Sequence, residues 1–211
     1  MNVSPSKENI LKKIRKALSQ STPLPFPQSE GNQSVFPPLE QEAEIEFAEQ
    51  FTKLQGKFIY CINQQEMAFQ LASLIKKQDW QKVFCTEDKL IAPFASQIDE
   101  RLTKTDLADC DVSITGCEYL VARTGSIMLS ATQLSGRSAS VYAPIHVCIA
   151  FTNQLVYDIK DALQAAKEKY GNNLPSLITF ATGPSRTADI EKTLVVGVHG
   201  PKEVYVFLVE A

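Results

Sequence analysis

Hydrophobic and polar residues follow helical spacing in the first stretch of the chain. Four apolar side chains recur on one face: Ile10, Leu11, Ile14 and Leu18. Pro5 suits the first position of a helix, so the pattern predicts an amphipathic helix within residues 1–20. Five positive side chains against one negative leave this helix with a net charge of +4. It either packs on the rest of the protein, docks a partner, or pairs two copies of the chain into a homo-oligomer.

Proline then interrupts any regular pattern. Five prolines lie among serine, glutamine, glycine and asparagine: Pro23, Pro25, Pro27, Pro37 and Pro38. Because proline fixes φ and has no amide donor, residues 21–39 are predicted to be an extended linker. Residues 40–211 then form the main domain.

Strand-like and helix-like patterns alternate within the main domain. Short apolar runs predict strands at 58–62, 82–85, 112–115, 126–130, 139–142, 145–151, 177–181 and 204–209. Helical spacing predicts helices near 40–56, 65–77, 88–98 and 158–170, with a short helical turn at 117–121. Continuous apolar strands separated by helices indicate an α/β fold, with a mostly parallel, partly mixed sheet sandwiched by helices. Ligands of such sheets bind beyond the carboxyl ends of the strands.

Charge and hydropathy argue against several classes of function. The net charge of −3 gives no overall positive field, so nucleic acid is not expected as a partner. No run approaches the ~20 apolar residues that a membrane-spanning helix needs. The N-terminus also lacks the apolar core of a secretory signal, so we expect a cytoplasmic protein without a membrane span.

The cysteines and histidines form no metal-binding pattern. The five cysteines, none of them in a closely spaced pair, are Cys61, Cys85, Cys110, Cys117 and Cys148. Three lie in apolar runs, where cysteine behaves as a small buried hydrophobe. We therefore expect reduced thiols, with no metal, iron–sulfur cluster or other cofactor bound by this chain.

The segment 182–189 is the strongest candidate for a binding site. It follows a predicted buried strand, turns at a glycine and a proline, and leads into a predicted short helical turn. Glycine lets backbone amides approach a ligand, a helix start presents unpaired amides, and arginine binds a carboxylate or phosphate through two hydrogen bonds. The same residues also fit a plain turn in which Ser185 caps the helix and Arg186 pairs with Asp189. The residues assigned to ligand binding are Gly183, Ser185, Arg186, Thr187 and Asp189.

Two further segments contribute candidates. His199 and Gly200 precede the last strand, where His199 is either a general acid or base, a donor to an anion, or a turn residue. In the segment 118–126, Glu118 is a second candidate acid or base. The ligand-binding candidates there, which equally fit a tight turn, are Thr124, Gly125 and Ser126. The other histidine, His146, fits a hydrogen-bonded residue inside a strand.

Three motifs occur in a fixed order: ARTGSIMLS at 122–130, TGPSRTADIE at 182–191 and GVHGP at 197–201. Over roughly residues 40–211 they resemble the LUD domain and, within it, the lactate-utilisation protein C (YkgG-like) family. The resemblance implies a fold like the NagB/RpiA/CoA-transferase group. It also implies a role in oxidising L-lactate to pyruvate, beside partner subunits that carry iron–sulfur clusters. Arg123 stands where many relatives carry aspartate, which makes the local charge more positive.

Three functions are compatible with these features. The favoured one is a cluster-free accessory subunit of a lactate-utilisation system, with a cleft for a small carboxylate or phosphate. The alternative is a stand-alone enzyme acting on a phosphorylated, acyl-CoA or folate-type substrate. In that enzyme Arg186 would clamp the anion, and His199 or Glu118 would move a proton. The third is a scaffold that docks through its basic N-terminal helix.

Overall fold

The computed structural model describes residues 5–19, 41–190 and 193–211 of the chain. The chain divides into two compact units, residues 1–38 and residues 39–211. In the first unit, helix α1 (Pro5–Leu18) forms where the helical spacing predicted it. Its apolar side chains Ile10, Leu11 and Ile14 are all exposed. The predicted proline-rich linker at 21–39 lies outside the described residues.

The second unit is built on a six-stranded sheet in which every neighbouring pair of strands is parallel. Here the predicted parallel arrangement is confirmed. Two of the strands, β12 and β7, lie side by side near the middle and pair along their whole lengths. In spatial order the strands are β1 (Lys57–Cys61), β12 (Glu203–Val209), β7 (Ile145–Phe151), β4 (Val112–Thr115), β2 (Val83–Phe84) and β3 (Leu102–Thr103).

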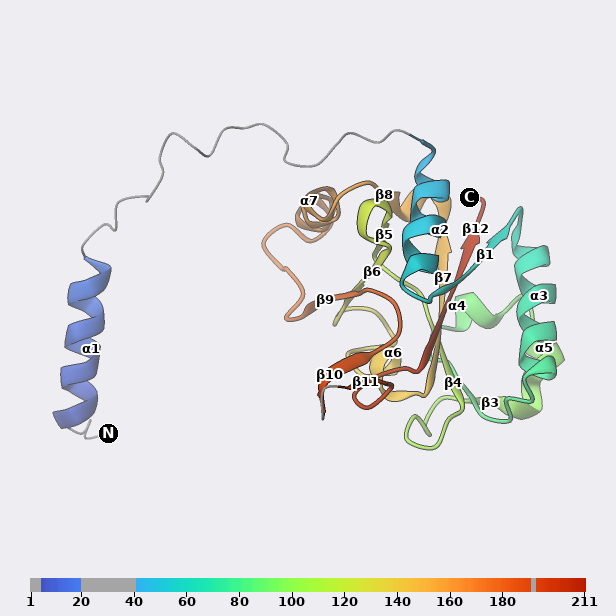
Figure 1. The fold of residues 1–211 in the computed structure, drawn as a ribbon, viewed down its shortest axis with the longest axis horizontal. Helices are drawn as coiled ribbons and strands as arrows, with labels where there is room; N and C mark the ends of the chain where they lie inside the picture. Colours follow the sequence, from blue (N-terminus) through green and yellow to red (C-terminus); the bar gives the residue numbers. More distant parts are fainter. Residues whose placement is uncertain (1–4, 20–40, 191–192) are drawn as a thin grey trace. The chain divides into compact units, whose positions relative to one another are not determined.

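A second, mixed sheet covers one face of the first (Figure 1). Its strands, in order, are β8 (Leu155–Val156), β5 (Tyr119–Val121), β6 (Ser126–Ser130) and β9 (Ile178–Ala181). Strand β6 is antiparallel to both of its neighbours. The sequence predicted mixed β structure in this region, but it did not predict a separate sheet.

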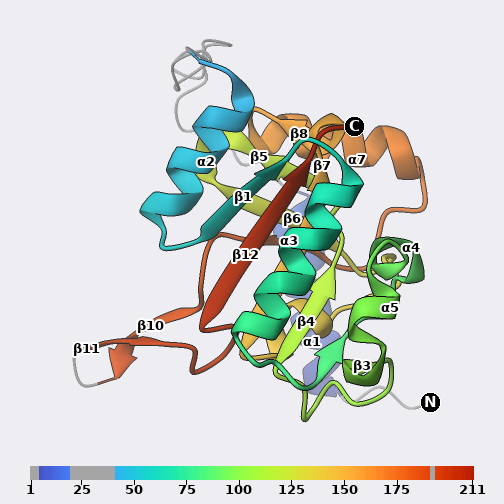
Figure 2. The same cartoon turned by 90° about the vertical axis from the view of Figure 1, so that its right-hand side faces the viewer.

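Helices cover the outer faces of the two sheets. Figure 2 shows α3 (Gln64–Lys77) lying across the open face of the six-stranded sheet. Helix α7 (Ile159–Tyr170) covers the second sheet, and α2 (Ala43–Lys53) packs beside β5 and β6 between the layers. Short elements complete the unit: α4 (Asp88–Ile91), α5 (Ala95–Ile98), α6 (Ala139–Tyr142), η1 (Asp99–Arg101), η2 (Ala122–Thr124) and η3 (Thr152–Gln154).

The alternation of side chains along β7 explains the layering. Val147 and Ile149 point into the core beneath α3, whereas Cys148 and Ala150 point into the core shared with the second sheet. Both sets are buried, so the strand is apolar from Val147 to Phe151. His146 has the same parity as Cys148 and therefore belongs to the side that faces the second sheet.

Three local predictions are wrong. Residues 139–142, predicted as a strand, form α6, whose Ala139 packs with Phe84 and Cys110. The predicted helical turn at 117–121 contains strand β5, which pairs with β6 through a left-handed turn at Gly125. Short apolar runs fit either structure, and tertiary pairing decided between them.

The third error concerns the segment after 184. Instead of a helical turn, residues 186–190 form β10 (Arg186–Ile190), which pairs antiparallel with β11 (Thr193–Val196). This hairpin projects from the edge where β12 begins (Figure 2). Because no helix starts there, the unpaired amides expected of a helix N-terminus are absent from this described segment.

Candidate functional site

Two of the three sequence motifs meet in one pocket of about 240 Å³, which we call the motif pocket. The loop 182–185 forms one wall, and the turn 199–201 forms another. The remaining wall is formed by Ser140 of α6, His146 of β7 and Val204 of β12. The motif pocket thus lies between the two sheets, where β7 and β12 begin. Strand β9 and the loop after its carboxyl end line it, and it lies at the amino edge of the six-stranded sheet.

Backbone hydrogen bonds hold these two loops together. The amide of Ser185 donates to the carbonyl oxygen of Pro201 at 2.9 Å, and the amide of Gly197 donates to the carbonyl oxygen of Ser185 at 3.0 Å. A side chain at Gly200 would lie 2.9 Å from Cβ of Ser185, so the two loops approach too closely for any larger residue. The predicted residues Gly183, Ser185, His199 and Gly200 therefore belong to one site.

A wider hollow of about 500 Å³ adjoins the motif pocket and shares His199 and Gly200 with it. Tyr142 and Lys202 also line this hollow. No salt bridge involving Lys202 occurs in the described part of the chain. Its ammonium group and the exposed His199 ring are therefore available to attract an anion at the mouth of the pocket.

The hairpin residues of the second motif do not line the motif pocket. Arg186 is exposed and donates from Nη2 to the carbonyl oxygen of Leu54, just beyond α2. Thr187 pairs with Val195 inside the hairpin. Asp189 lies on β10, and its side chain is outside the described part of the structure. In this structure Arg186 thus ties the hairpin to the end of α2.

The first motif connects to the second through hydroxyl groups. Thr124 Oγ1 is 2.8 Å from Ser126 Oγ, which is 2.8 Å from Thr182 Oγ1. Gly125 has φ of +59°, and a Cβ atom there would lie 2.6 Å from the backbone nitrogen of Phe51. These residues join the end of α2 to the motif loops. Thr124, Gly125 and Ser126 are not among the lining residues of the pocket.

Gly183 has a similar role on the second loop. Its φ is +76°, and a Cβ atom would lie 2.9 Å from the carbonyl oxygen of Leu54. Positive φ is unfavourable for residues with a side chain, and the close approach adds a steric reason for glycine. Gly125 and Gly183 therefore allow these two loops to lie against the end of α2.

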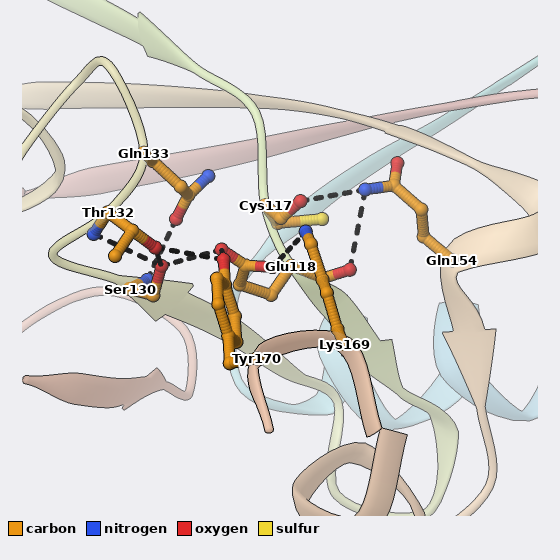
Figure 3. A network of polar contacts seen from close by, with 8 residues as sticks. All are labelled: Cys117, Glu118, Ser130, Thr132, Gln133, Gln154, Lys169 and Tyr170. Atoms are coloured by element: carbon orange, nitrogen blue, oxygen red, sulfur yellow. Dashed lines mark hydrogen bonds and ion pairs between the residues drawn. The ribbon is translucent and has the colours of Figure 1, made fainter. Parts of the chain in front are cut away.

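Glu118 lies in a separate buried network (Figure 3). Its Oε1 accepts hydrogen bonds from Ser130 Oγ at 2.5 Å and from Tyr170 OH at 2.7 Å. Its Oε2 pairs with Lys169 Nζ at 2.7 Å. Burial alone would raise the pKa of Glu118, but these donors outweigh it and hold the pKa below its usual value. Glu118 is therefore a charged anchor between α7 and the second sheet, and it does not line the pocket with His199.

Arg123 of the first motif also forms a structural ion pair. Its Nε donates to Oδ2 of Asp158 at 2.7 Å, and Asp158 Oδ1 accepts from the amide of Lys160 at the start of α7. Burial raises the pKa of Asp158, but the Lys160 amide and Arg123 hold it below its usual value. The positive charge at position 123 thus secures the N-terminus of α7.

Sequence reasoning missed the residues that the fold brings to the pocket from elsewhere. Ser140, His146 and Lys202 belong to none of the candidate sites, and α6 was predicted as a strand. His146 was expected to be fully hydrogen-bonded, but only its Nε2 has a partner, Thr115 Oγ1 at 2.8 Å. A histidine at the start of an apolar strand, two residues after Pro144, was the one signal for it in the sequence.

Three other features concern the cysteines, metal binding and membrane spans. All five cysteines are free and buried. Within residues 5–19, 41–190 and 193–211, no group of three histidine, cysteine or acidic side chains is arranged to hold a metal ion. None of the helices in these ranges is both long and apolar enough to cross a membrane.

Fold and pocket together define a layered α/β protein with a small pocket between its two sheets. The family model of the LUD domain matches residues 45–209, and the chain belongs to this family. In a crystal structure, a DUF162 family protein from Deinococcus radiodurans has the same fold. It superposes with a TM-score of 0.60 over 82% of this chain and 99% of that chain, at 20% identity.

Curated relatives carry a name that refers to lactate. A lactate utilization protein C from Bacillus licheniformis is 34% identical over 114 residues, which cover 53% of this chain and 47% of the relative. Another from Oceanobacillus iheyensis is 25% identical over 182 residues, covering 82% and 78%. An uncharacterized protein from Neisseria meningitidis is 30% identical over 123 residues, covering 58% and 52%. This chain spans about half the length of the relatives from Neisseria meningitidis and Bacillus licheniformis.

Proposed function

We propose that this protein serves in L-lactate utilisation as a subunit that carries no iron–sulfur cluster and binds a small carboxylate in the motif pocket. Membership of the LUD family and the name of the curated relatives support the pathway. The observation that carries the binding role is the meeting of two sequence motifs around a single pocket of about 240 Å³. Partner subunits would hold the clusters that accept the electrons.

The shape and charge of the site favour a small anion. The pocket is smaller than the ~300–1,000 Å³ of sites for drug-sized ligands, so it suits a metabolite of a few carbon atoms. Lys202 and His199 line the adjoining hollow and can interact with a carboxylate there. Ser185 and Ser140 add hydroxyl groups inside the pocket.

Binding is tested with the full-length protein by isothermal titration with L-lactate, pyruvate and propionate. We expect saturable binding by at least one of them, and about tenfold weaker binding in Lys202→Gln. Lys167→Gln, which removes an exposed lysine from α7, is the matched control and should bind like the native protein. Failure of all three acids to bind would overturn the carboxylate site.

The pathway is tested separately in the native host. A strain lacking the gene should grow poorly on L-lactate, and a tagged copy should restore growth and co-purify with proteins that contain iron–sulfur clusters. Normal growth of the deletion strain on L-lactate, with no cluster protein recovered on the tagged copy, would contradict the role in lactate utilisation.

The alternative of a stand-alone enzyme has less geometric support. That hypothesis needs Arg186 to clamp an anion and Glu118 or His199 to move a proton. Arg186 instead binds the carbonyl oxygen of Leu54, and Glu118 is ion-paired within its own network away from the pocket lining. Only His199 remains at the pocket, so the binding role is the better-supported conclusion.

A further inference from the structure

His146 lines the motif pocket and carries one hydrogen-bonding atom without a partner. The side chain is fully buried and forms part of the pocket lining. Its Nδ1 is the one buried side-chain nitrogen or oxygen in the described residues that has no hydrogen-bond partner. Leaving a buried polar atom unpaired is costly, so such an atom in a native fold calls for a partner that is absent from the isolated chain.

The hydrogen-bond network determines what kind of atom Nδ1 is. The hydroxyl of Thr115 donates its single hydrogen to the carbonyl oxygen of Gly116 at 2.9 Å. In the tautomer that lets Thr115 keep this bond, its oxygen accepts from Nε2–H of His146, 2.8 Å away. Burial lowers the pKa of His146 to about 4, so the ring is neutral at pH 7. Nδ1 consequently carries a lone pair and no hydrogen.

Neighbouring side chains cannot supply the missing donor. Ser113 pairs with His146 across the β4–β7 ladder, but its hydroxyl hydrogen is donated to the carbonyl oxygen of Ala139 at 2.6 Å. On the other side His146 pairs with Val204, whose side chain has no polar atom. The remaining direction is the pocket, which His146 lines together with Ser185 and Gly200.

The lone pair restricts the chemistry of the ligand. A carboxylate at neutral pH only accepts hydrogen bonds, so it cannot satisfy Nδ1. The group that meets Nδ1 must carry a hydrogen, whereas the ammonium group of Lys202 and the N–H of the His199 ring, which line the adjoining hollow, suit an anion. A 2-hydroxycarboxylate has both features on adjacent carbon atoms.

We propose that the motif pocket binds a 2-hydroxycarboxylate whose hydroxyl group donates to Nδ1 of His146 and whose carboxylate faces Lys202. This inference rests on the proposed carboxylate site and deepens it. The keto oxygen of a 2-oxo acid has only lone pairs and would be repelled by Nδ1. His146 therefore makes the site selective for the reduced form of the ligand.

Two substitutions of His146 distinguish the roles of its two ring nitrogens. His146→Gln places an amide near the position of Nε2, so it can keep the bond to Thr115 but loses the acceptor at Nδ1. His146→Asn places its amide oxygen near the position of Nδ1, so it keeps the acceptor but loses the bond to Thr115. A general packing defect would affect both variants, whereas the proposed role affects only the first.

The experiment measures the affinity of the full-length protein and both variants for L-lactate, propionate and pyruvate, which differ at the second carbon. Titration calorimetry gives the affinities, and circular-dichroism melts show whether the variants are folded. In the native protein we expect L-lactate to bind at least about tenfold more tightly than either propionate or pyruvate. We expect His146→Gln to abolish that preference and His146→Asn to retain it.

The results distinguish a failure of the role of His146 from a failure of the proposed carboxylate site. Equal binding of the three acids by the native protein would overturn the role of His146 while leaving the carboxylate site in place. Retention of the lactate preference in folded His146→Gln would overturn it as well. Binding of none of the acids would overturn both proposals. If His146→Gln does not fold, the ligand series on the native protein and on His146→Asn still decides.

Discussion

Replacing Glu118 by glutamine tests how the charged network between α7 and the second sheet contributes to stability. The substitution keeps the size of the side chain and removes the negative charge. Glu118 is 4% exposed and accepts two hydroxyl hydrogen bonds and one from Lys169. A hydrogen bond to a charged group contributes about 1.5–3 kcal/mol, against about 0.5–1.5 for a neutral pair.

Each of the two hydroxyl bonds should therefore weaken by about 1 kcal/mol. The ammonium bond to Lys169 is also lost, but that side chain is 53% exposed and can turn into water, so it adds little. The lower cost of burying a neutral amide offsets part of the loss. We expect the free energy of unfolding at pH 7 to fall by about 2 kcal/mol, which corresponds to about 4–8 °C in Tm for a chain of this size.

The loss of stability in Glu118→Gln should also depend on pH in a characteristic way. Because the pKa of Glu118 is lowered in the folded state, its contribution is fully present above the unfolded value of about 4.3. It is lost as the pH falls through the lower folded pKa. The gap between the native protein and Glu118→Gln should therefore be constant from pH 8 to about pH 5 and shrink below about pH 4.

Urea unfolding followed by circular dichroism at several pH values measures this gap. Glu168→Gln is the matched control, because Glu168 is an exposed carboxylate on the same helix and bonds only to Gln164. It should change stability by less than about 0.5 kcal/mol. If Glu118→Gln unfolded at the same urea concentration as this control at pH 7, or if the gap persisted undiminished in acid, the reasoning about Glu118 would be refuted.

Three further predictions follow from packing, burial and the first helix. Gly125→Ala should destabilise the protein by at least about 2 kcal/mol more than Gly136→Ala. Both positions have positive φ, but of the two only Gly125 is packed against backbone atoms. Urea unfolding compares the two variants, and equal losses of stability would contradict the packing argument. The five buried thiols should not react with a thiol reagent at pH 8 until guanidinium unfolds the protein. Burial raises the pKa of Cys85, for example, to about 12. Rapid reaction of the folded protein would count against this prediction. Deleting residues 1–38 should lower the oligomeric mass measured by light scattering, because three apolar side chains of α1 are exposed. An unchanged number of subunits would rule out assembly through that helix.

The sequence predicted the main sheet well because its strands are buried on both faces. The boundaries 112–115 and 145–151 agree with β4 and β7 residue for residue, and 126–130 agrees in the same way with β6 of the second sheet. A continuous apolar run bounded by turn residues is a strong local signal when both faces of the strand are covered. Helix α7 was equally clear, because Asp158 caps its start and Gly171 follows its end.

Local signals failed where a short segment depends on its partner. Strand β10 forms because β11 is available to pair with it, and β11 itself was not predicted. The segment 139–142 became helical as Ala139 packed against Phe84 and its carbonyl oxygen accepted a hydrogen bond from Ser113. Phe84 and Ser113 lie far from 139–142 in the sequence, so they could not inform a local pattern.

For the candidate site, the sequence by itself determined which loops are involved but not what each residue does. The motifs around Gly183 and His199 were identified correctly as parts of one signature, and the fold brings them to one pocket. Only the tertiary structure showed that Arg186 and Glu118 are bound elsewhere, and that His146 lines the motif pocket and Lys202 the adjoining hollow. The reason is physical: residue type limits the hydrogen bonds a side chain can make, but the neighbours that use them are set by the packing of the two sheets.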